Sequence, residues 1–291
     1  MTSNQPLLPV ELEMSIFDIA ARSYPRFITT LMLVAWRVKL WVEPLLYRTL
    51  VVSRSAIEGH PNYPHPHSLK RGCKPTSPFQ IHSESAAFLQ QSVRNLYFSF
   101  DIPAEVAECI LRPCSGVENL WITATSAPNT DLFRIISALP LKRLHCELTQ
   151  LFYSQSQAPA QVDFALGYGY AQADLTHTMF SHLTHLELFD DPKDGLERWR
   201  GLALLPRLTH LALNNSKFLP LCPELLGTCK ALKGHTCMGF GATDPRFVVI
   251  GCGEYMKDWQ VGAHEGVDYW SRAEECVRLQ LGYPTMQSNG E

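Results

Sequence analysis

The sequence lacks any long run of hydrophobic residues. The longest apolar stretch, Leu31 to Trp36, has six residues, whereas a membrane-spanning helix needs about 20. The first residues lack the basic and apolar regions of a secretory signal, and the nine cysteines include no C-x-x-C pair. We therefore expect a protein outside the membrane, in a reducing compartment, cytoplasmic or nuclear, with its thiols mostly buried.

The chain also lacks an excess of basic charge. It carries 25 lysine and arginine residues against 28 aspartate and glutamate residues, a formal net charge of −3, which argues against a nucleic-acid partner. The catalytic motifs G-x-S-x-G, H-E-x-x-H, G-x-x-x-x-G-K-[ST] and G-x-G-x-x-G do not occur. These absences predict a protein that is not an enzyme and uses no cofactor.

Side chains that bind metals occur without the spacing of a metal site. Two groups stand out, His60, His65 and His67 in one loop and Cys229, His235 and Cys237 in another region. Neither group has the paired ligand spacing of a structural zinc site. No bound metal is expected.

The sequence does contain a repeated phrase with apolar residues at its first, fourth and sixth positions. Its fourth position is Leu96, Leu120, Leu144, Leu186 and Leu211, in steps of 24, 24, 42 and 25 residues. Leucine-rich repeats have a period of about 20 to 29 residues, each contributing a strand and a helix. Because such arrays bind partners on one face, the phrase indicates recognition rather than catalysis.

This pattern predicts an α/β fold, a leucine-rich-repeat solenoid with a curved, mostly parallel sheet and outer helices. The repeats occupy residues 81–243, with helices near Ala104–Leu111, Asp131–Leu139 and Leu196–Leu205. The step of 42 residues predicts an insertion at about 150–178. The alternative is a degenerate extra repeat around Val162–Leu166.

Residues 244–283 follow the repeats and are expected to complete the fold. Arg246–Ile250 is β-branched and predicts a last strand. Asp268 is suited to the N-cap of a helix from Tyr269 to Leu281, and Gly282 to its C-terminal end. This helix would close the open end of the solenoid, because repeat arrays need capping elements.

Alternate residues of a strand point to opposite faces, so the residues between the apolar phrase positions define the concave face. The candidate target-binding residues are Asn95, Asn119, Arg143, His185 and His210 in one row, and Tyr97, Trp121, His145 and Glu187, with Ala212, in the next. Tyr97 beside Trp121 would form an aromatic pair suited to anchoring a protein target. The alternative is that a helix edge or the inserted loop covers both rows.

The stretch from Leu144 to Pro192 has no lysine or arginine. It contains six acidic residues, Glu147, Asp163, Asp174, Glu187, Asp190 and Asp191. Were they to cluster, an acidic surface would steer a basic target. The alternative is a solvated face without a partner.

Residues 8–52 have the apolar spacing of helices. One helix is predicted from Pro9 to near Tyr24, and a second from Pro25 to about Leu45. Residues 47–52 then alternate as a strand that joins the helices to the repeats. Residues 53–80 carry five prolines and are predicted to form a loop.

The run Leu8-Pro9-Val-Glu11-Leu-Glu-Met-Ser-Ile16-Phe17, followed by Leu31-Met-Leu33-Val34 and Trp41-Val-Glu-Pro44-Leu-Leu-Tyr47-Arg48, resembles the F-box. The layout as a whole resembles the F-box-like proteins with leucine-rich repeats that are abundant in mushroom-forming fungi. The resemblance implies that the helices dock on the Skp-type adaptor of a cullin-RING (SCF-type) ubiquitin ligase, while the repeats hold a target. By position, the adaptor-facing or module-core residues would be Leu8, Pro9, Ile16, Phe17, Leu31, Val34 and Trp41.

Two functional hypotheses follow. The first is a non-enzymatic adaptor that binds a ligase through the N-terminal helices and an unknown protein target through the concave face. The second is a protein-binding scaffold without a ubiquitin ligase, in which those helices only cap the repeats. Burial of Ile16, Phe17, Leu31 and Trp41 against the first repeats would favour the scaffold.

Overall fold

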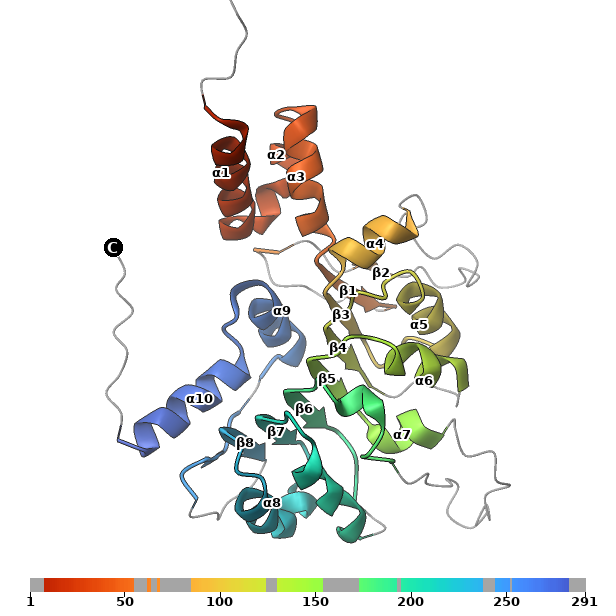
Figure 1. Cartoon of the computed structure of the whole chain (residues 1–291), viewed down its shortest axis with the longest axis vertical. Helices are drawn as coiled ribbons and strands as arrows, with labels where there is room; N and C mark the ends of the chain where they lie inside the picture. Colours follow the sequence, from red (N-terminus) through yellow and green to blue (C-terminus); the bar gives the residue numbers. More distant parts are fainter. Residues whose placement is uncertain are drawn as a thin grey trace, which may run out of the picture.

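A computed structural model describes residues 8–54, 62–63, 67–68, 85–123, 130–153, 173–192, 195–237, 244–251 and 253–282. Within these ranges nine strands form one sheet in the order β2-β1-β3-β4-β5-β6-β7-β8-β9, and every neighbouring pair is parallel. Apart from β2, each strand adds beside the preceding one (Figure 1). The predicted α/β class with a parallel sheet is confirmed, and the strand order is compatible with a solenoid-like array.

The repeated phrase supplies the central strands. The strands are β1 (Thr49–Ser53), β2 (His67–Ser68), β3 (Asn95–Phe98), β4 (Asn119–Ile122), β5 (Arg143–Cys146), β6 (His185–Leu188), β7 (His210–Leu213), β8 (Gly234–Cys237) and β9 (Phe247–Val248). The fourth-position leucines pair with one another from β3 to β7. Strand β5 pairs directly with β6, so in the described sheet no strand separates these two repeats.

Helices cover one face of the sheet (Figure 1). They are α4 (Ala86–Ser92), α5 (Ala104–Leu111), α6 (Thr130–Ser137), α7 (Leu148–Tyr153) and α8 (Cys222–Thr228), with 3₁₀ helices η3 (Thr178–Phe180), η4 (Glu197–Leu204) and η5 (Ser216–Leu221). The helix predicted at Leu196–Leu205 is thus a 3₁₀ helix. Gly201 lies in its middle and weakens a regular α-helix. A Cβ at this glycine would lie 2.9 Å from Leu175 Cδ1, so a larger residue here would require the Leu175 side chain to shift.

The main core lies between the sheet and these helices. The fourth- and sixth-position side chains, such as Leu120 and Ile122 of β4, are buried there with helix residues such as Ile110 and Phe133. The core also contains the buried cysteines Cys114, Cys146, Cys222 and Cys229. Thiols therefore serve here as small apolar side chains, as expected.

The N-terminal helices pack on one another around a small core of their own. They are α1 (Val10–Ser23), the 3₁₀ helix η1 (Pro25–Phe27), α2 (Ile28–Leu31) and α3 (Trp36–Leu46). Their buried residues are Ala21, Ile28, Val38 and Val42. Two hydrogen bonds of 3.0 and 2.7 Å from Arg37 to the Glu13 carboxylate tie α3 to α1.

The prediction of one continuous helix after Pro25 is wrong. The chain breaks between α2 and α3, where Ala35 is extended (φ −161°, ψ 155°). The break allows α2 and α3 each to contact α1. Apolar residues recur every three or four positions through the break, so the periodicity could not reveal it.

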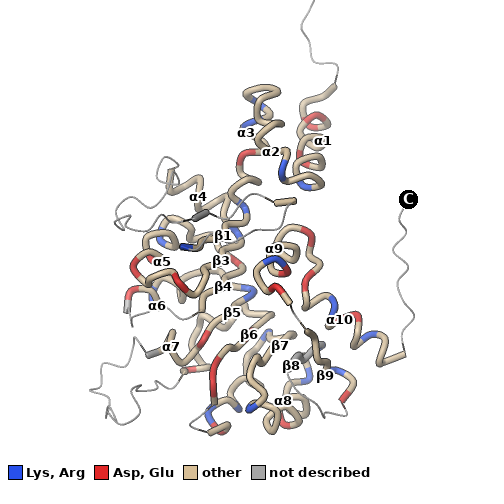
Figure 2. Tube along the Cα trace, turned by 180° about the vertical axis from the view of Figure 1, so that it is seen from behind, with Lys and Arg blue, Asp and Glu red and all other residues tan. Residues whose placement is uncertain are grey.

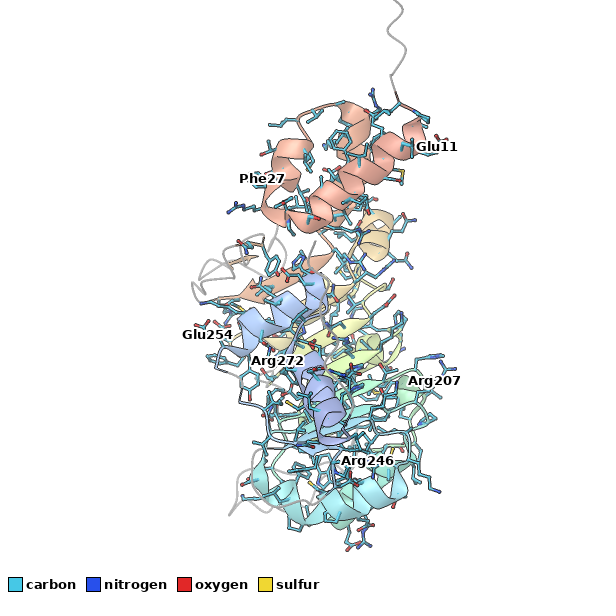
Figure 3. All side chains as sticks on the ribbon, turned by 90° about the vertical axis from the view of Figure 1, so that its left-hand side faces the viewer. Glu11, Phe27, Arg207, Arg246, Glu254 and Arg272 are labelled. Carbon is cyan, nitrogen blue, oxygen red and sulfur yellow. The ribbon has the colours of Figure 1, made fainter. Side chains whose placement is uncertain are left out.

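Two C-terminal helices cover the opposite face of the sheet. They are α9 (Tyr255–Glu265) and α10 (Tyr269–Gln280), and both lie in front of the strands in Figure 3. The predicted cap of α10 is present: the Asp268 side chain accepts a hydrogen bond from Ser271 N, and Gly282 has φ +81°. However, α10 lies over the strands rather than across the end of the array, and α9 was not predicted.

Lysine and arginine residues are interspersed with aspartate and glutamate along the chain (Figure 2). Many of them pair locally, as Lys142 does with Glu118 and Arg200 with Glu224. None of the helices in the described ranges has the length and apolar character needed to cross a membrane.

A buried carboxylate connects neighbouring repeats. Asp190, after β6, accepts hydrogen bonds from Leu148 N, Thr149 N and Thr149 Oγ1 at 2.8, 2.8 and 2.6 Å. Asp190→Ala would leave two backbone N–H groups without this acceptor, each costing about 1–3 kcal/mol when buried. We expect the free energy of unfolding, measured by urea denaturation, to fall by about that amount or more.

The neighbouring residue provides the matched control. Asp191 forms a half-exposed ion pair with Lys217, and such pairs contribute less than about 1 kcal/mol. Asp191→Ala should therefore leave the urea midpoint nearly unchanged. Equal effects of the two substitutions would contradict a specific role for Asp190.

Candidate functional site

The two predicted rows lie together on one face of the sheet, which we call the strand face: the face of β1 and β3–β9 that points away from α4–α8. Strand register aligns the first row as Asn95, Asn119, Arg143, His185 and His210. It aligns the second as Tyr97, Trp121, His145, Glu187 and Ala212. The residues that sequence alternation assigned to one surface are therefore neighbours.

Ring stacking runs along both rows. Tyr97 stacks on Trp121 with ring centroids 5.2 Å apart, and Trp121 stacks on His145 at 4.7 Å. In the other row, His185 and His210 are nearly parallel, with 4.2 Å between their rings. Strands in a parallel sheet lie about 4.8 Å apart, so planar side chains at matching positions fall naturally into contact.

The expectation of an open surface here is wrong. Trp121 is 3 % exposed, and His145 and Glu187 are each 1 % exposed. Trp259 of α9 packs with Trp121, and Trp270 of α10 lies against His185 and His210. The second possibility, that a helix covers the two rows, is the arrangement found. The covering helices come from the C-terminal segment.

A buried polar cluster lies at the centre of the covered face. Glu187 Oε2 lies 2.7 Å from His145 Nδ1 and accepts a hydrogen bond of 2.6 Å from the Tyr269 hydroxyl. Glu187 Oε1 accepts a 2.6 Å bond from the Asn214 amide, whose oxygen accepts one from the Tyr255 hydroxyl at 3.1 Å. The buried carboxylate is therefore satisfied by strands and covering helices together, as burial of a charge requires.

Charged and polar contacts surround this cluster. Arg143 Nη1 donates to Asp268 Oδ2 at 2.8 Å, and Trp259 Nε1 donates to Asn119 Oδ1 at 3.3 Å. His210 Nε2 lies 2.8 Å from Glu274 Oε1, within ion-pair distance but not aligned as a hydrogen bond. Several polar groups on the strand face are thus paired with groups on α9 and α10.

Tyr63, in the segment between β1 and β2, contacts the C-terminal end of α9. Its ring stacks on His264 with 4.2 Å between centroids, and its hydroxyl donates to Glu265. Burial and the adjacent Glu265 carboxylate raise the pKa of the Tyr63 hydroxyl. The N-terminal part of the array therefore contributes to the position of the C-terminal helices.

Sequence reasoning missed the residues that cover the face. They include Trp259, Tyr269, Trp270 and Glu274. One signal was available: residues 255–270 contain two tryptophans and two tyrosines, which bury large areas and seldom stay exposed together. Nothing in the local sequence, however, specified the strands that these rings would contact.

The cluster of His145, Glu187 and Tyr269 combines residue types used in acid–base chemistry, but each side chain is buried beneath α9 and α10. No described group of three or more His, Cys, Asp or Glu side chains is arranged to hold a metal ion. The side chains of His60, His65, His67, His235 and Cys237 lie outside the described residues. The arrangement is suited to holding a protein segment in place.

The candidate adaptor-binding residues lie on the N-terminal helices. Leu8, Pro9, Ile16 and Val34 are exposed. Phe17, Leu31 and Trp41 are half-buried in the helices' own core, where the Phe17 and Trp41 rings are 6.5 Å apart. The first four residues are therefore surface positions, and the other three support the packing of the helices.

Three of the six acidic residues that suggested an acidic surface do not supply free surface charge. Glu187 and Asp190 are buried, and Asp191 pairs with Lys217. Burial and the nearby Asp190 carboxylate raise the pKa of Glu147. Asp163 lies outside the described residues. Glu187, Asp190 and Asp191 therefore do not form an acidic surface for a basic target.

No protein-family model matches the chain, and no curated protein matches its sequence. Function must therefore be argued from the two surfaces described above, the exposed N-terminal helices and the covered strand face.

The covered histidines predict a loss of stability in acid. Burial, His210, Arg143 and His145 lower the pKa of His185 to about 2, and burial lowers the pKa of His210 despite the nearby Glu274. Unfolded histidines have a pKa near 6.5, so below that pH the unfolded chain binds protons that the folded chain does not. The free energy of unfolding should be highest above pH 7 and fall by up to about 1.4 kcal/mol per pH unit per histidine.

Urea denaturation at pH 7.5, 6.5 and 5.5 measures this slope. His185→Gln removes one of the responsible groups and should flatten it, whereas His182→Gln, at an exposed histidine, serves as the control. An unchanged slope in the His185 variant would contradict the assignment.

Proposed function

We propose that this protein is a non-enzymatic recognition adaptor whose N-terminal helices dock on the Skp-type adaptor of a cullin-RING ubiquitin ligase. The repeat array then presents a protein target to the ligase. The proposal combines the resemblance of residues 8–52 to the F-box with the surface that these residues form. It requires no catalytic residue in this chain.

The observation that carries the proposal is an apolar surface on α1–α3. Its large exposed side chains are Leu8, Val10, Leu12, Met14, Ile16, Ile19, Tyr24, Phe27, Leu33, Val34, Trp36 and Leu40. Ile16 is 52 % exposed and Val34 is 61 % exposed. Such a concentration of exposed apolar side chains on one small helical unit supports an interaction site.

The position of these helices supports the same reading. They extend beyond the end of the sheet, with only the end of α3 near α4 (Figure 1), and Phe27 lies at their outer edge (Figure 3). Their core contains no residue of the main core. A helical cap that served only the repeats would bury Ile16, Phe17, Leu31 and Trp41 against them, and these residues do not lie in the main core.

The mechanism is proximity. A protein that binds a ligase at one end and a target along its sheet raises the effective concentration of the target at the ligase. That gain can reach about 10²- to 10⁴-fold without any new contact. The separation of the helical surface from the sheet allows both partners to be bound at once.

The covered strand face favours a second candidate, a repeat scaffold without a ligase. With α9 and α10 in place, the rows around Trp121 and His145 are buried and cannot contact a target. In that case the sheet is an internal support, and recognition falls to the remaining surface. The binding experiment below separates the two candidates.

Binding of the intact chain to a purified Skp-type adaptor tests the proposal. Ile16→Ala/Val34→Ala truncates two exposed side chains without touching the helical core. We expect at least a tenfold rise in Kd, measured by calorimetry, because a tenfold change needs only about 1.4 kcal/mol. Circular dichroism would verify that the variant is folded.

The matched control is Val249→Ala/Leu279→Ala, which removes the same kind of exposed apolar surface near the other end of the chain. This variant should bind like the intact protein. Absence of binding by the intact chain, or equal losses in both variants, would leave the scaffold as the better account.

A further inference from the structure

The contact between the strand face and the C-terminal helices has the composition of an interface between two proteins. Trp259, Tyr269 and Trp270 insert into it as aromatic anchors. Around them lie paired polar groups, including Arg143 with Asp268. Interfaces commonly combine a few buried aromatic and arginine anchors with satisfied polar contacts, whereas domain cores are more uniformly apolar.

The buried side chains of this contact are separate from the main core. They form three small clusters: Val51, Trp121, Met256 and Trp259; Ala212, Tyr269 and Trp270; and Val248, Ala273 and Val277. None of these residues belongs to the main core. The leucine-filled core between the sheet and α4–α8 is therefore built without any residue of α9 or α10.

Helices α9 and α10 are held to each other as well as to the sheet. Asp258 of α9 accepts hydrogen bonds from Tyr269 N at 2.8 Å and from Arg272 at 2.6 Å. Asp268 and Ser271 form a reciprocal cap at the start of α10. Gly266 ends α9 with φ +76°, a conformation that favours glycine. The two helices therefore form a hairpin that can move as one unit.

The contact also includes a buried group that is not satisfied. Trp270 Nε1 is buried and has no hydrogen-bond partner among the described residues. A buried donor without a partner lowers the stability of the docked state relative to the open one. This loss of stability weakens the contact between α9–α10 and the strand face.

We propose that α9–α10 is an internal ligand of the strand face, which detaches as a unit while the sheet stays folded. The target that takes its place is a helical protein segment with the pattern of α10. This inference rests on the proposed recognition function and assigns the kind of target.

The pattern follows from the contacts of α10. An acidic residue at the helix start pairs with Arg143, as Asp268 does. Two aromatic residues follow, of which the first reaches Glu187 and the second covers the His185 and His210 rings. A second acidic residue one turn later reaches His210, as Glu274 does.

Native-state hydrogen exchange on the intact chain tests detachment directly. Amides of α9 and α10 should share one exchange free energy, with protection factors at least tenfold lower than those of β3–β7. Low urea concentrations should lower both helices' protection together. Exchange of α9–α10 only through global unfolding, with the same protection as β3–β7, would overturn the proposal.

A peptide in trans tests recognition. The probe is fluorescein-labelled peptide Val267–Gly282, and the receptor is the full chain carrying Trp259→Ala/Trp270→Ala, which weakens the hairpin without altering the strand face. We expect saturable binding by fluorescence anisotropy. The control peptide carries Asp268→Ala/Trp270→Ala and should bind at least tenfold more weakly.

Each other outcome is informative. A receptor variant whose β3–β7 amides lose protection would show that the hairpin is needed for the core, which contradicts detachment. A folded receptor that binds neither peptide, or both equally, would contradict recognition of the pattern. The test of binding to the Skp-type adaptor uses Ile16 and Val34, which lie outside the hairpin contact. Absence of that binding would overturn the proposed function without deciding whether the hairpin detaches.

Discussion

Parallel pairing of β3 to β7 in a single register is the constraint on which the rest of the structure depends. With leucine at the fourth position of every phrase, Leu96, Leu120, Leu144, Leu186 and Leu211 stack into one row of the core. The side chains between them are then forced onto the other face, because a strand alternates its side chains. That second face carries tryptophan, histidine, arginine and glutamate, so it needs either water or a matched partner.

The chain supplies such a partner from its own C-terminal segment. Burying Glu187 costs free energy unless donors surround it, and Tyr269, Asn214 and His145 lie at hydrogen-bond distance. This arrangement makes the covering helices specific: a helix pair lacking the Tyr269 hydroxyl or the Asp268 carboxylate would leave buried polar groups unmatched. Buried polar contacts therefore determine which segment binds, and the aromatic rings contribute the apolar area.

Sequence periodicity was sufficient for β1 and β3–β9, for α5 and for the start of α10, since these depend on local spacing and capping. It missed β2, a two-residue edge strand within the predicted loop 53–80. Helix η4 was placed correctly but formed as a 3₁₀ helix around Gly201. The helix break before Trp36 was not predicted, because the apolar spacing continues through it. Both rows on the strand face were assigned correctly, yet their burial was not. Arg143 and Asp268 are 125 residues apart, and no local pattern at either residue indicates the other.

The N-terminal helices and the strand face differ in whether their apolar side chains are covered. On the strand face, rings such as Trp121 are covered by the chain itself, whereas on α1–α3 side chains such as Ile16 and Trp36 remain in water. Leaving apolar surface in water lowers solubility and offers the folded chain no stability, so a partner is the simplest physical account of it. In the two-site scheme, the helical surface is ready for a constant partner, while the covered face admits only a segment that matches its charges and displaces the hairpin. Selectivity then follows from competition, since a segment without the acidic and aromatic pattern of α10 gains too little to replace it.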